Sequence, residues 1–441
     1  MGKTKDSRLL LSQLVKNNYK DSKTYSELAL LYGKLEDYKT AKTLYEKAIH
    51  ITSNDSQLYF NLASIQRYLG KIKDAEVSLD KAIDLNPLDC EAYLLRSSLT
   101  KQSSENNHIS EMKSVLLKGI NNPTHYAQLS FALAKEYEDL EQFDKSFSHL
   151  NKGADYRRRN MQYDPKNDLE TINNIIDAFD SEIFEQNKND YNNNEAIFIL
   201  GLPRTGSTLV ERIIGSHNEV YSAGELNNFA LQMMEQCKKV QQQAPKSRAE
   251  LVQLTTQLKF SELGTAYIDS TRPNTAQNKR FIDKLPLNSL YVGLIHLALP
   301  KAKIIHVKRH PLDTCYSIYK QLFTNGYPFS YNLKELADYY IANHKLMEHW
   351  NSVIPDAIYT INYEQLIDNF EDESKQLIAH CQLDWQEQCL QFYQNKQASV
   401  TASASQVRQP IYRSSIAKWR NFEKQLNPIK KQLEQAGISC D

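Results

Sequence analysis

The feature that most restricts the fold of this chain is an internal repeat near its beginning. Aromatic, leucine and alanine residues of a first copy recur 34 residues later: Tyr25, Leu28, Ala29, Tyr32, Ala41, Tyr45 and Ala48 correspond to Tyr59, Leu62, Ala63, Gln66, Ala75, Leu79 and Ala82. Small residues allow two antiparallel helices to approach closely, while the larger side chains fill the space between successive helix pairs. A period of this length therefore predicts a helical solenoid.

Two less regular copies extend the pattern. One contains Leu133, Ala134, Tyr137, Ser146, Leu150 and Gly153, and a weaker one before it contains Tyr93, Met112, Leu116, Gly119 and Pro123. The pattern resembles the tetratricopeptide repeat, which implies roughly four helix pairs over residues 22–157 and a candidate capping helix over residues 6–19. Unrelated helices that share this spacing by coincidence are the alternative. Such solenoids usually present a concave surface to a peptide, so we expect a peptide or protein partner that the repeats do not identify.

Length and composition limit the remaining possibilities. A chain of 441 residues is expected to form two or three domains. Its 53 Lys and Arg residues balance 53 Asp and Glu residues, so net charge gives no reason to expect nucleic acid or a membrane surface as a partner. Six cysteines without C-x-x-C or metal-ligand spacing indicate a reduced chain. Because no signal-peptide core or long apolar run occurs, we expect a cytoplasmic protein without a transmembrane segment.

The segment AIFILGLPRTGSTLVERIIGSHNEV, starting at Ala196, has the outline of a phosphate-binding loop. An apolar strand leads to Gly201, four further residues, Gly206 and a hydroxyl pair, which is close to the G-x-x-x-x-G-K-[ST] spacing. Ser207 stands in place of the usual lysine, which contacts the β- and γ-phosphates in ATP and GTP sites. This difference disfavours phosphoryl transfer from a triphosphate.

The loop can still hold a smaller anion without a metal. Backbone N–H groups at the start of a helix, two hydroxyls and an arginine can all contact such an anion. The run PRTGSTLVE, followed by GEL, is similar to the 5′-phosphosulfate loop and catalytic-glutamate segment of the sulfotransferases, and of the protein-tyrosine sulfotransferases in particular. The resemblance implies that 3′-phosphoadenosine-5′-phosphosulfate (PAPS) is bound here by Arg204, Thr205, Gly206, Ser207 and Thr208.

Later segments match the same family in the same order. Strands are expected over residues 280–283 and 303–307, and the basic residues Lys284 and Arg309 follow them. Ligands of open α/β sheets bind at the carboxyl ends of strands, so these residues and the loop are expected to converge. DKLP matches a family segment whose lysine lies beside the sulfuryl group, although an ordinary exposed charge is the alternative for Lys284. Arg309 and Ser317 match the pair that holds the donor's 3′-phosphate.

Further donor contacts are expected closer to the C-terminus. Tyr363 follows a strand-like run over residues 357–362 and resembles the tyrosine beside the adenine in this family, with a buried strand-end tyrosine as the alternative. The segment SVTASASQVRQPIYRSSIAKWRNF resembles the one that closes over the nucleotide. Its candidates for nucleotide contacts are Ser403, Arg413 and Lys418. His310 stands where relatives commonly have an acidic residue, and we interpret it as a structural neighbour of the site.

The reaction requires a base, because a hydroxyl acceptor loses its proton as the new S–O bond forms. Glu225, in YSAGELNNF, matches the catalytic glutamate of the family; alternatively, it only opens the next helix, where an acidic residue is favourable. The resemblance assigns Arg204 and Lys284 to stabilisation of the leaving phosphate. In-line sulfuryl transfer is thus expected, with 3′-phosphoadenosine-5′-phosphate (PAP) as product and without a metal.

The predicted organisation has three parts: a tetratricopeptide-like repeat domain over residues 1–160, a helical connector over residues 161–195 and a sulfotransferase domain over residues 196–441. The expected fold class is an α-solenoid followed by a P-loop-like three-layer α/β domain with a mostly parallel sheet. Both halves together look like bacterial tetratricopeptide-sulfotransferase fusions. A peptide tyrosine is the leading acceptor, while a saccharide or small-molecule acceptor, a P-loop-type kinase and an inactive repeat scaffold are the alternatives. The sequence carries no information on oligomeric state.

Overall fold

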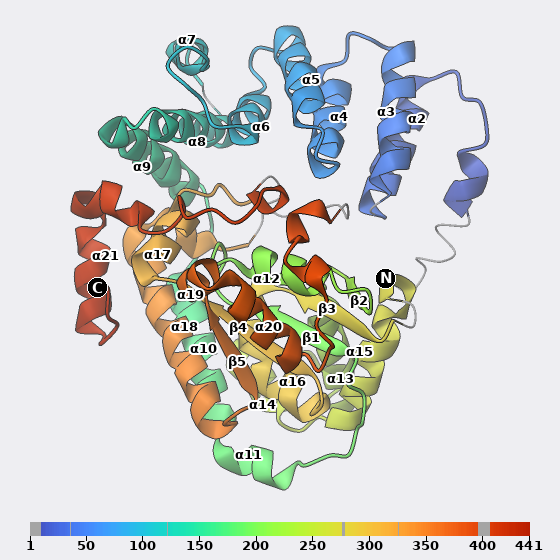
Figure 1. Cartoon of the computed structure of the whole chain (residues 1–441), viewed down its shortest axis with the longest axis vertical. Helices are drawn as coiled ribbons and strands as arrows, with labels where there is room; N and C mark the ends of the chain where they lie inside the picture. Colours follow the sequence, from blue (N-terminus) through green and yellow to red (C-terminus); the bar gives the residue numbers. More distant parts are fainter. Residues whose placement is uncertain (1–9, 36, 121, 276–277, 325, 396–405) are drawn as a thin grey trace.

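The computed structural model describes residues 10–441 except 36, 121, 276–277, 325 and 396–405. The predicted solenoid is confirmed as a series of helix pairs (Figure 1): α2 (Ser22–Lys34) with α3 (Tyr38–Ile51), α4 (Ser56–Tyr68) with α5 (Ile72–Leu85), α6 (Cys90–Leu99) with α7 (Ile109–Leu117), and α8 (Pro123–Asp139) with α9 (Phe143–Arg159). Of the candidate capping helix, residues 10–14 are helical, and the residues before them lie outside the described part of the chain.

Local sequence explains where these helices begin and how closely they pack. Asp21, Asp37, Asp55 and Asp89 precede α2, α3, α4 and α6, and each side chain accepts a hydrogen bond from a backbone N–H group in the first turn. Such caps satisfy donors that the helix itself leaves without partners. The repeated alanines at the helix crossings are completely buried, as the spacing predicted.

The second half begins with α10 (Pro165–Ala178) and α11 (Ser181–Gln186) and continues into an α/β domain. Its strands are β1 (Ala196–Leu200), β2 (Val220–Ser222), β3 (Arg280–Lys284), β4 (Lys303–Lys308) and β5 (Ile358–Asn362). Its helices are α12 (Ser207–Ile214), α13 (Asn228–Val240), α14 (Arg248–Thr255), α15 (Phe260–Thr275), α16 (Val292–Ala298), α17 (Pro311–Tyr319), α18 (Leu333–Val353), α19 (Tyr363–Asp368), α20 (Phe370–His380) and α21 (Glu423–Gln435), joined in places by short 3-10 turns.

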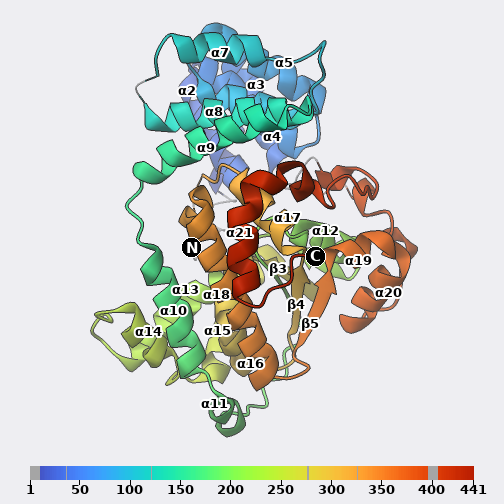
Figure 2. The ribbon, with the colours of Figure 1, turned by 90° about the vertical axis from the view of Figure 1, so that its left-hand side faces the viewer.

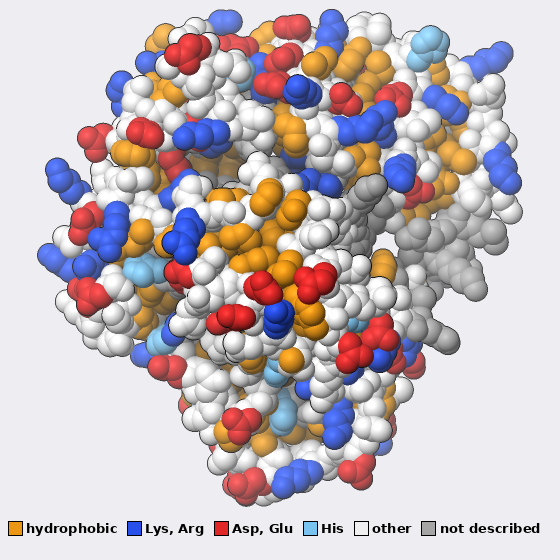
Figure 3. All heavy atoms as spheres, in the orientation of Figure 1, with side chains coloured by type: hydrophobic (Ala, Val, Ile, Leu, Met, Phe, Trp, Pro, Cys, Tyr) orange, Lys and Arg blue, Asp and Glu red, His pale blue; other side chains and the backbone are white. Residues whose placement is uncertain are grey.

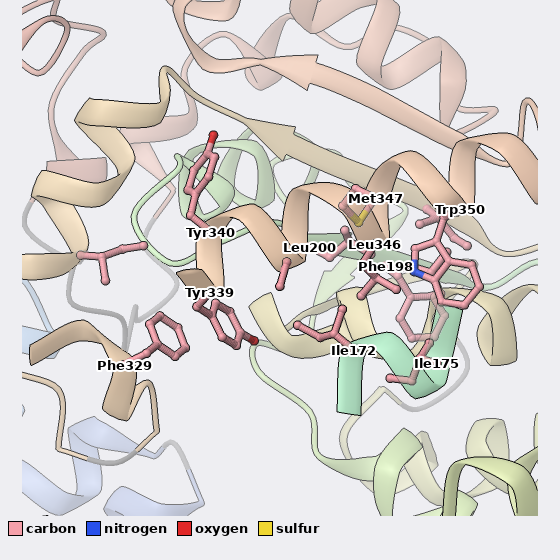
Figure 4. Packing of buried hydrophobic residues seen from close by; sticks show 14 of the residues in the cluster. Ile172, Ile175, Phe198, Leu200, Phe329, Tyr339, Tyr340, Leu346, Met347 and Trp350 are labelled. Carbon is pink, nitrogen blue, oxygen red and sulfur yellow. The ribbon is translucent and has the colours of Figure 1, made fainter. Parts of the chain in front are cut away.

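The sheet has the order β2-β3-β1-β4-β5, and all of its paired strands are parallel. Side chains of β1 alternate between two apolar clusters: Phe198 and Leu200 pack on one face, and Ile197 and Ile199 on the other. Figure 4 shows the first cluster, in which β1 meets α10 and α18. Because both faces of the central strand are covered, the predicted three-layer α/β arrangement is confirmed.

The solenoid packs against the α/β domain over a continuous apolar contact. Phe131 of α8 and Phe147 of α9 belong to the same buried cluster as Phe198 of β1. Arg158 of α9 donates hydrogen bonds of 2.8 and 2.9 Å to the carboxylate of Glu335 in α18. Figure 2 shows the chain leaving α9 and descending through α10 beside α18. The last helix pair of the solenoid is therefore also part of the core of the second domain.

The outer surface agrees with the balanced charge of the chain. Acidic and basic side chains are interspersed over the face shown in Figure 3, and hydrophobic side chains gather between the solenoid and the lower part of the α/β domain. None of the helices in the described ranges is both long and apolar enough to cross a membrane.

Candidate active site

The loop between β1 and α12 adopts a backbone that requires glycine at two positions. Gly201 has φ +140°, and a Cβ atom there would lie 2.5 Å from the carbonyl oxygen of Val307 in β4. Gly206 has φ +108°, and a Cβ atom there would lie 2.5 Å from Cδ2 of Tyr363. The loop thus lies directly against the carboxyl end of β4 and the start of α19, and Gly206, the N-cap of α12, has no side chain to cover the first N–H groups of that helix.

A cavity of about 130 Å³ opens in front of this loop. Its floor is the loop and the start of α12, and its walls come from α17 and α19. Its cover is formed by residues 406–418, which we call the roof segment and which lies between the solenoid and α12 in Figure 1. The predicted site residues that line this cavity are Arg204, Gly206, Ser207, Thr208, Arg309, Ser317, Tyr363 and Lys418. The convergence expected from the sheet edge is therefore present for these residues.

Arg309 connects the parts of this cavity. One terminal nitrogen of its guanidinium donates to the carbonyl oxygen of Arg204 (3.0 Å) and to Oγ of Ser317 (3.3 Å). The other donates to the carbonyl oxygen of Ser415 in the roof segment (2.6 Å). Its Nε atom is buried and has no hydrogen-bond partner among the described residues. A buried donor of this kind favours an added acceptor, as an anionic ligand would supply.

Tyr363 lies between Arg309 and the loop. The Arg309 guanidinium is 5.0 Å from the centre of the Tyr363 ring, a cation–π distance, and the phenol oxygen is 2.7 Å from Oγ of Ser415. The ring also packs on Gly206, as the position of the absent Cβ atom shows. Tyr363 therefore forms a fixed aromatic wall on which a planar ring could stack.

Positive charge is concentrated in the cavity. Burial, and next the charge of Arg309, lower the pKa of Arg204 to about 10. Lys320 and Lys418 also line the cavity, and both approach the same carboxylate, that of Glu138 in α8. The two guanidinium groups repel each other, and an anion bound between them would relieve this repulsion.

Glu225 and Lys284 form a second group at the same sheet edge. Lys284 ends β3, is aligned with Ile199 of β1 and is only 2% exposed. Its ammonium group donates a hydrogen bond to the carboxylate of Glu225, whose side chain is 49% exposed. The two residues do not line the cavity described above. Thus the predicted base and one of the predicted cations contact each other directly beside the loop.

Two further predicted site residues, Thr205 and Arg413, do not line the cavity. Thr205 is buried and its hydroxyl donates to the carbonyl oxygen of Leu202 (2.8 Å), so its side chain holds the loop in shape. Arg413 points to the surface and pairs with Asp368 at 2.7 Å. Ser403 lies outside the described residues. His310 stacks on Trp419 at 5.3 Å, which agrees with its interpretation as a structural neighbour.

Several lining residues were not predicted. Lys320 follows Ser317 by three residues at the end of α17, and this helical spacing could have indicated it. The contributions of Gln406, Tyr412 and Ser415 had no such signal, because the roof segment has no regular periodicity. In the described part of the chain, no group of three or more His, Cys, Asp or Glu side chains is placed to hold a metal ion.

Comparison with known families agrees with this architecture. Residues 196–387 match the model of a sulfotransferase family, and residues 22–55 and 56–87 each match the tetratricopeptide repeat. The chain therefore joins tetratricopeptide repeats to a domain that matches the sulfotransferase family.

Two relatives are similar to parts of the chain. An uncharacterized protein of Aquifex aeolicus (strain VF5) is 34% identical over 316 residues, which cover 70% of this chain and 41% of the relative. The protein-tyrosine sulfotransferase of Drosophila melanogaster is 21% identical over 231 residues, covering 51% of this chain and 46% of that protein. The chain thus spans less than half the length of each of these relatives.

Among solved structures, the chain is similar to two excised sulfotransferase domains. That of the Synechococcus PCC 7002 olefin synthase has 21% identity and a TM-score of 0.39, covering 53% of this chain and 90% of the domain. That of the curacin biosynthetic pathway has 17% identity and a TM-score of 0.39, covering 56% of this chain and 99% of the domain.

Proposed function

We propose that this chain transfers a sulfuryl group from PAPS to a hydroxyl acceptor, with a peptide tyrosine as the leading acceptor. The observation that carries the proposal is the cavity in front of the β1–α12 loop, where Arg204, Arg309 and Ser317 meet the loop and the Tyr363 ring. The loop has Ser207 where a triphosphate site would have lysine, and Arg309 has a buried N–H group without a protein acceptor among the described residues. These features suit a nucleotide that carries a 5′-phosphosulfate and a 3′-phosphate.

The bound donor supplies the sulfuryl group, and each further part of the chemistry is assigned to side chains. Glu225 accepts the proton of the acceptor hydroxyl as the new S–O bond forms and the S–O bond to the phosphate oxygen breaks. Arg204 and Lys284 neutralise the charge that develops on the departing phosphate. Arg309 and Ser317 hold the 3′-phosphate, and Tyr363 stacks beside the adenine. The direct contact between Lys284 and Glu225 supports this assignment, because it holds the two groups next to each other before the substrates bind.

An aromatic acceptor is supported by the surroundings of Glu225. Burial, and next the charge of Glu225, raise the pKa of Tyr327, so the Glu225 carboxylate acts on this phenol. The ring of Tyr327 lies 4.8 Å from that of Phe323. A phenol ring that packed on this pair would bring its hydroxyl towards the Glu225 carboxylate. The attached solenoid supports a peptide as the carrier of that phenol, since repeats of this type bind peptides.

Donor binding tests the proposal first. Calorimetry on the full chain should show binding of PAP and at least about tenfold weaker binding of ATP with Mg²⁺. ATP has no 3′-phosphate, and each charged hydrogen bond that is lost with it is worth about 1.5–3 kcal/mol. Arg309→Ala should abolish PAP binding, whereas Arg248→Ala, a matched control at an exposed pair with Asp168, should not change it. Preference for ATP would instead indicate a kinase, and binding of neither nucleotide would favour a repeat scaffold.

Turnover tests the assignment of the base and the acceptor. Glu225→Gln should lower the rate of sulfuryl transfer by about 100-fold or more and leave PAP affinity nearly unchanged. A peptide that contains tyrosine should accept the sulfuryl group, and the matched phenylalanine peptide should not. Full activity of Glu225→Gln would rule out the proposed base, and transfer only to a saccharide or a small phenol would exclude the peptide acceptor.

A further inference from the structure

Lys320 is a cation of the donor cavity to which no function has been assigned. It follows α17 directly and lies three residues after Ser317, so both side chains project from the same face of the helix. Both also line the cavity, together with Arg309. Arg309 and Ser317 are the residues proposed to hold the 3′-phosphate. An ammonium group on the same wall is placed to contact the same dianion.

A carboxylate from the solenoid fixes the position of Lys320. Nζ of Lys320 lies 2.8 and 3.1 Å from the two carboxylate oxygens of Glu138, which is near the end of α8. The hydroxyl of Tyr316 donates to the same carboxylate at 2.9 Å. Burial acts to raise the pKa of Glu138, but the charges of Lys320 and Lys418 outweigh it and hold that pKa at about 2. Glu138 is thus ionised at neutral pH and held by three partners from the α/β domain.

Lys418 attaches the roof segment to the same carboxylate. Its Nζ lies 3.6 Å from Oε1 of Glu138, and it lines the cavity together with Lys320. At its other end the roof segment also contacts the solenoid, because Arg408 donates to the carbonyl oxygen of Tyr68, the last residue of α4 (2.7 Å). Two cations that line the cavity, Lys320 after α17 and Lys418 in the roof segment, therefore both contact Glu138 of the solenoid.

We propose that Lys320 is a further binding residue for the 3′-phosphate of the donor and that Glu138 positions it, so that the solenoid forms part of the donor site. The inference rests on the proposed function, because it assumes a nucleotide with a 3′-phosphate. A lysine ammonium group has three donors, so Lys320 can keep its contact with Glu138 and still donate to a phosphate. The carboxylate also restricts a flexible side chain before the ligand arrives, which lowers the entropy cost of binding.

Glu138 has two opposing effects on a phosphate, and a suitable pair of substitutions separates them. Its charge repels the phosphate, whereas its contact orders Lys320. Glu138→Asp keeps the charge and withdraws the carboxylate from Lys320, so it weakens binding only if positioning matters. Glu138→Gln keeps the shape and removes the repulsion, so binding stays the same or becomes tighter. Glu141→Asp, at an exposed glutamate just after α8, is the matched control.

The experiment is calorimetric titration of the full chain with PAP and with adenosine 5′-phosphate, which lacks the 3′-phosphate. For wild type we expect PAP to bind more tightly than adenosine 5′-phosphate. Lys320→Met should weaken PAP by about 10- to 100-fold, the effect of one charged hydrogen bond, and leave adenosine 5′-phosphate within about twofold. Glu138→Asp should weaken PAP by about fivefold or more, with no effect of Glu141→Asp. Tyr316→Phe, which removes one contact to Glu138 without removing a charge, should act in the same direction if Glu138→Asp does not fold.

The outcomes separate the two proposals. If wild type does not bind PAP, the proposed donor is wrong and this inference fails with it. If wild type binds PAP but Lys320→Met binds it equally well, or loses both nucleotides equally, Lys320 is not a 3′-phosphate ligand. If Lys320→Met loses PAP selectively while Glu138→Asp and Tyr316→Phe do not, the solenoid has no part in positioning it.

Discussion

Substitution of Gly206 by alanine is the most direct test of the geometry of the loop. Gly206 has φ +108°, outside the range that residues with a side chain readily adopt. The new methyl group would lie 2.5 Å from Cδ2 and 3.0 Å from Cε2 of Tyr363. The ring cannot move away freely, because its hydroxyl contacts Ser415 and Arg309 lies against its face.

The expected loss of stability has two parts. A left-handed backbone costs an L-residue about 1–2 kcal/mol. Displacement of a packed ring by one extra methyl group adds about 1–3 kcal/mol. Gly206→Ala should therefore lower the free energy of unfolding by about 2–5 kcal/mol. Gly437→Ala is the matched control in the same domain: Gly437 has φ +82° and nothing within 4 Å of a Cβ atom, so only the backbone part applies.

Urea denaturation of wild type and both variants measures the two parts separately. We expect Gly206→Ala to be the less stable variant by about 1–3 kcal/mol, the cost of displacing the ring. When Gly206→Ala is introduced into Tyr363→Ala, the further loss in free energy of unfolding should be only the backbone part, because the side chain that clashes is absent. Equal stability of the two single variants would show that Tyr363 does not pack on the loop as described, and the stacking wall of the cavity would then be wrong.

Three further predictions test other parts of the structure. Arg158→Lys should lower the free energy of unfolding by about 1 kcal/mol in urea, since lysine cannot reproduce the two hydrogen bonds to Glu335; no change would refute this pairing. Burial raises the pKa of Asp283 to about 7, so the folded chain holds an extra proton above pH 3.8 and its stability falls as the pH rises to about 7, by up to about 1.4 kcal/mol per pH unit. Asp283→Asn should remove this part of the pH dependence, and an unchanged profile would contradict it. Arg408→Met, which loses the hydrogen bond to Tyr68, should speed amide hydrogen exchange in the roof segment, whereas equal exchange would show that this anchor is not needed.

The sequence allowed prediction of those parts of the fold that have a regular pattern. The central strand β1 is an apolar run that ends at a glycine, while β3 and β4 have short apolar centres and end at a basic residue, and the structure places each close to its predicted bounds. The repeat period likewise led to the helix pairs. The strand β2 was missed, because its three residues are too few for a periodic signal and two of them are partly exposed.

The candidate site was predictable where its residues follow strands, and less so elsewhere. Arg309 directly follows β4, so its convergence with the loop followed from the sheet rule, whereas Ser317 was chosen from the resemblance to the family. The roof segment offers no strand or long helix to fix its register. There Arg413 was chosen, whereas its neighbours Tyr412 and Ser415 line the cavity and Arg413 points to the surface. Where the sequence has neither helical nor strand periodicity, it does not define which side chains point inward, so a site residue can be assigned one or two positions away from the correct one.

The contacts between the solenoid and the α/β domain could not be predicted from local sequence. They nevertheless make the stability of each domain depend on the other. Phe131 and Phe147 close the apolar cluster that contains β1. Burial lowers the pKa of Lys320, and the charge of Glu138 opposes this lowering. An α/β domain without the solenoid would lose those two rings, expose the apolar surface that they cover and leave Lys320 without its counter-charge. The repeats and the α/β domain therefore share one apolar core at α8 and α9.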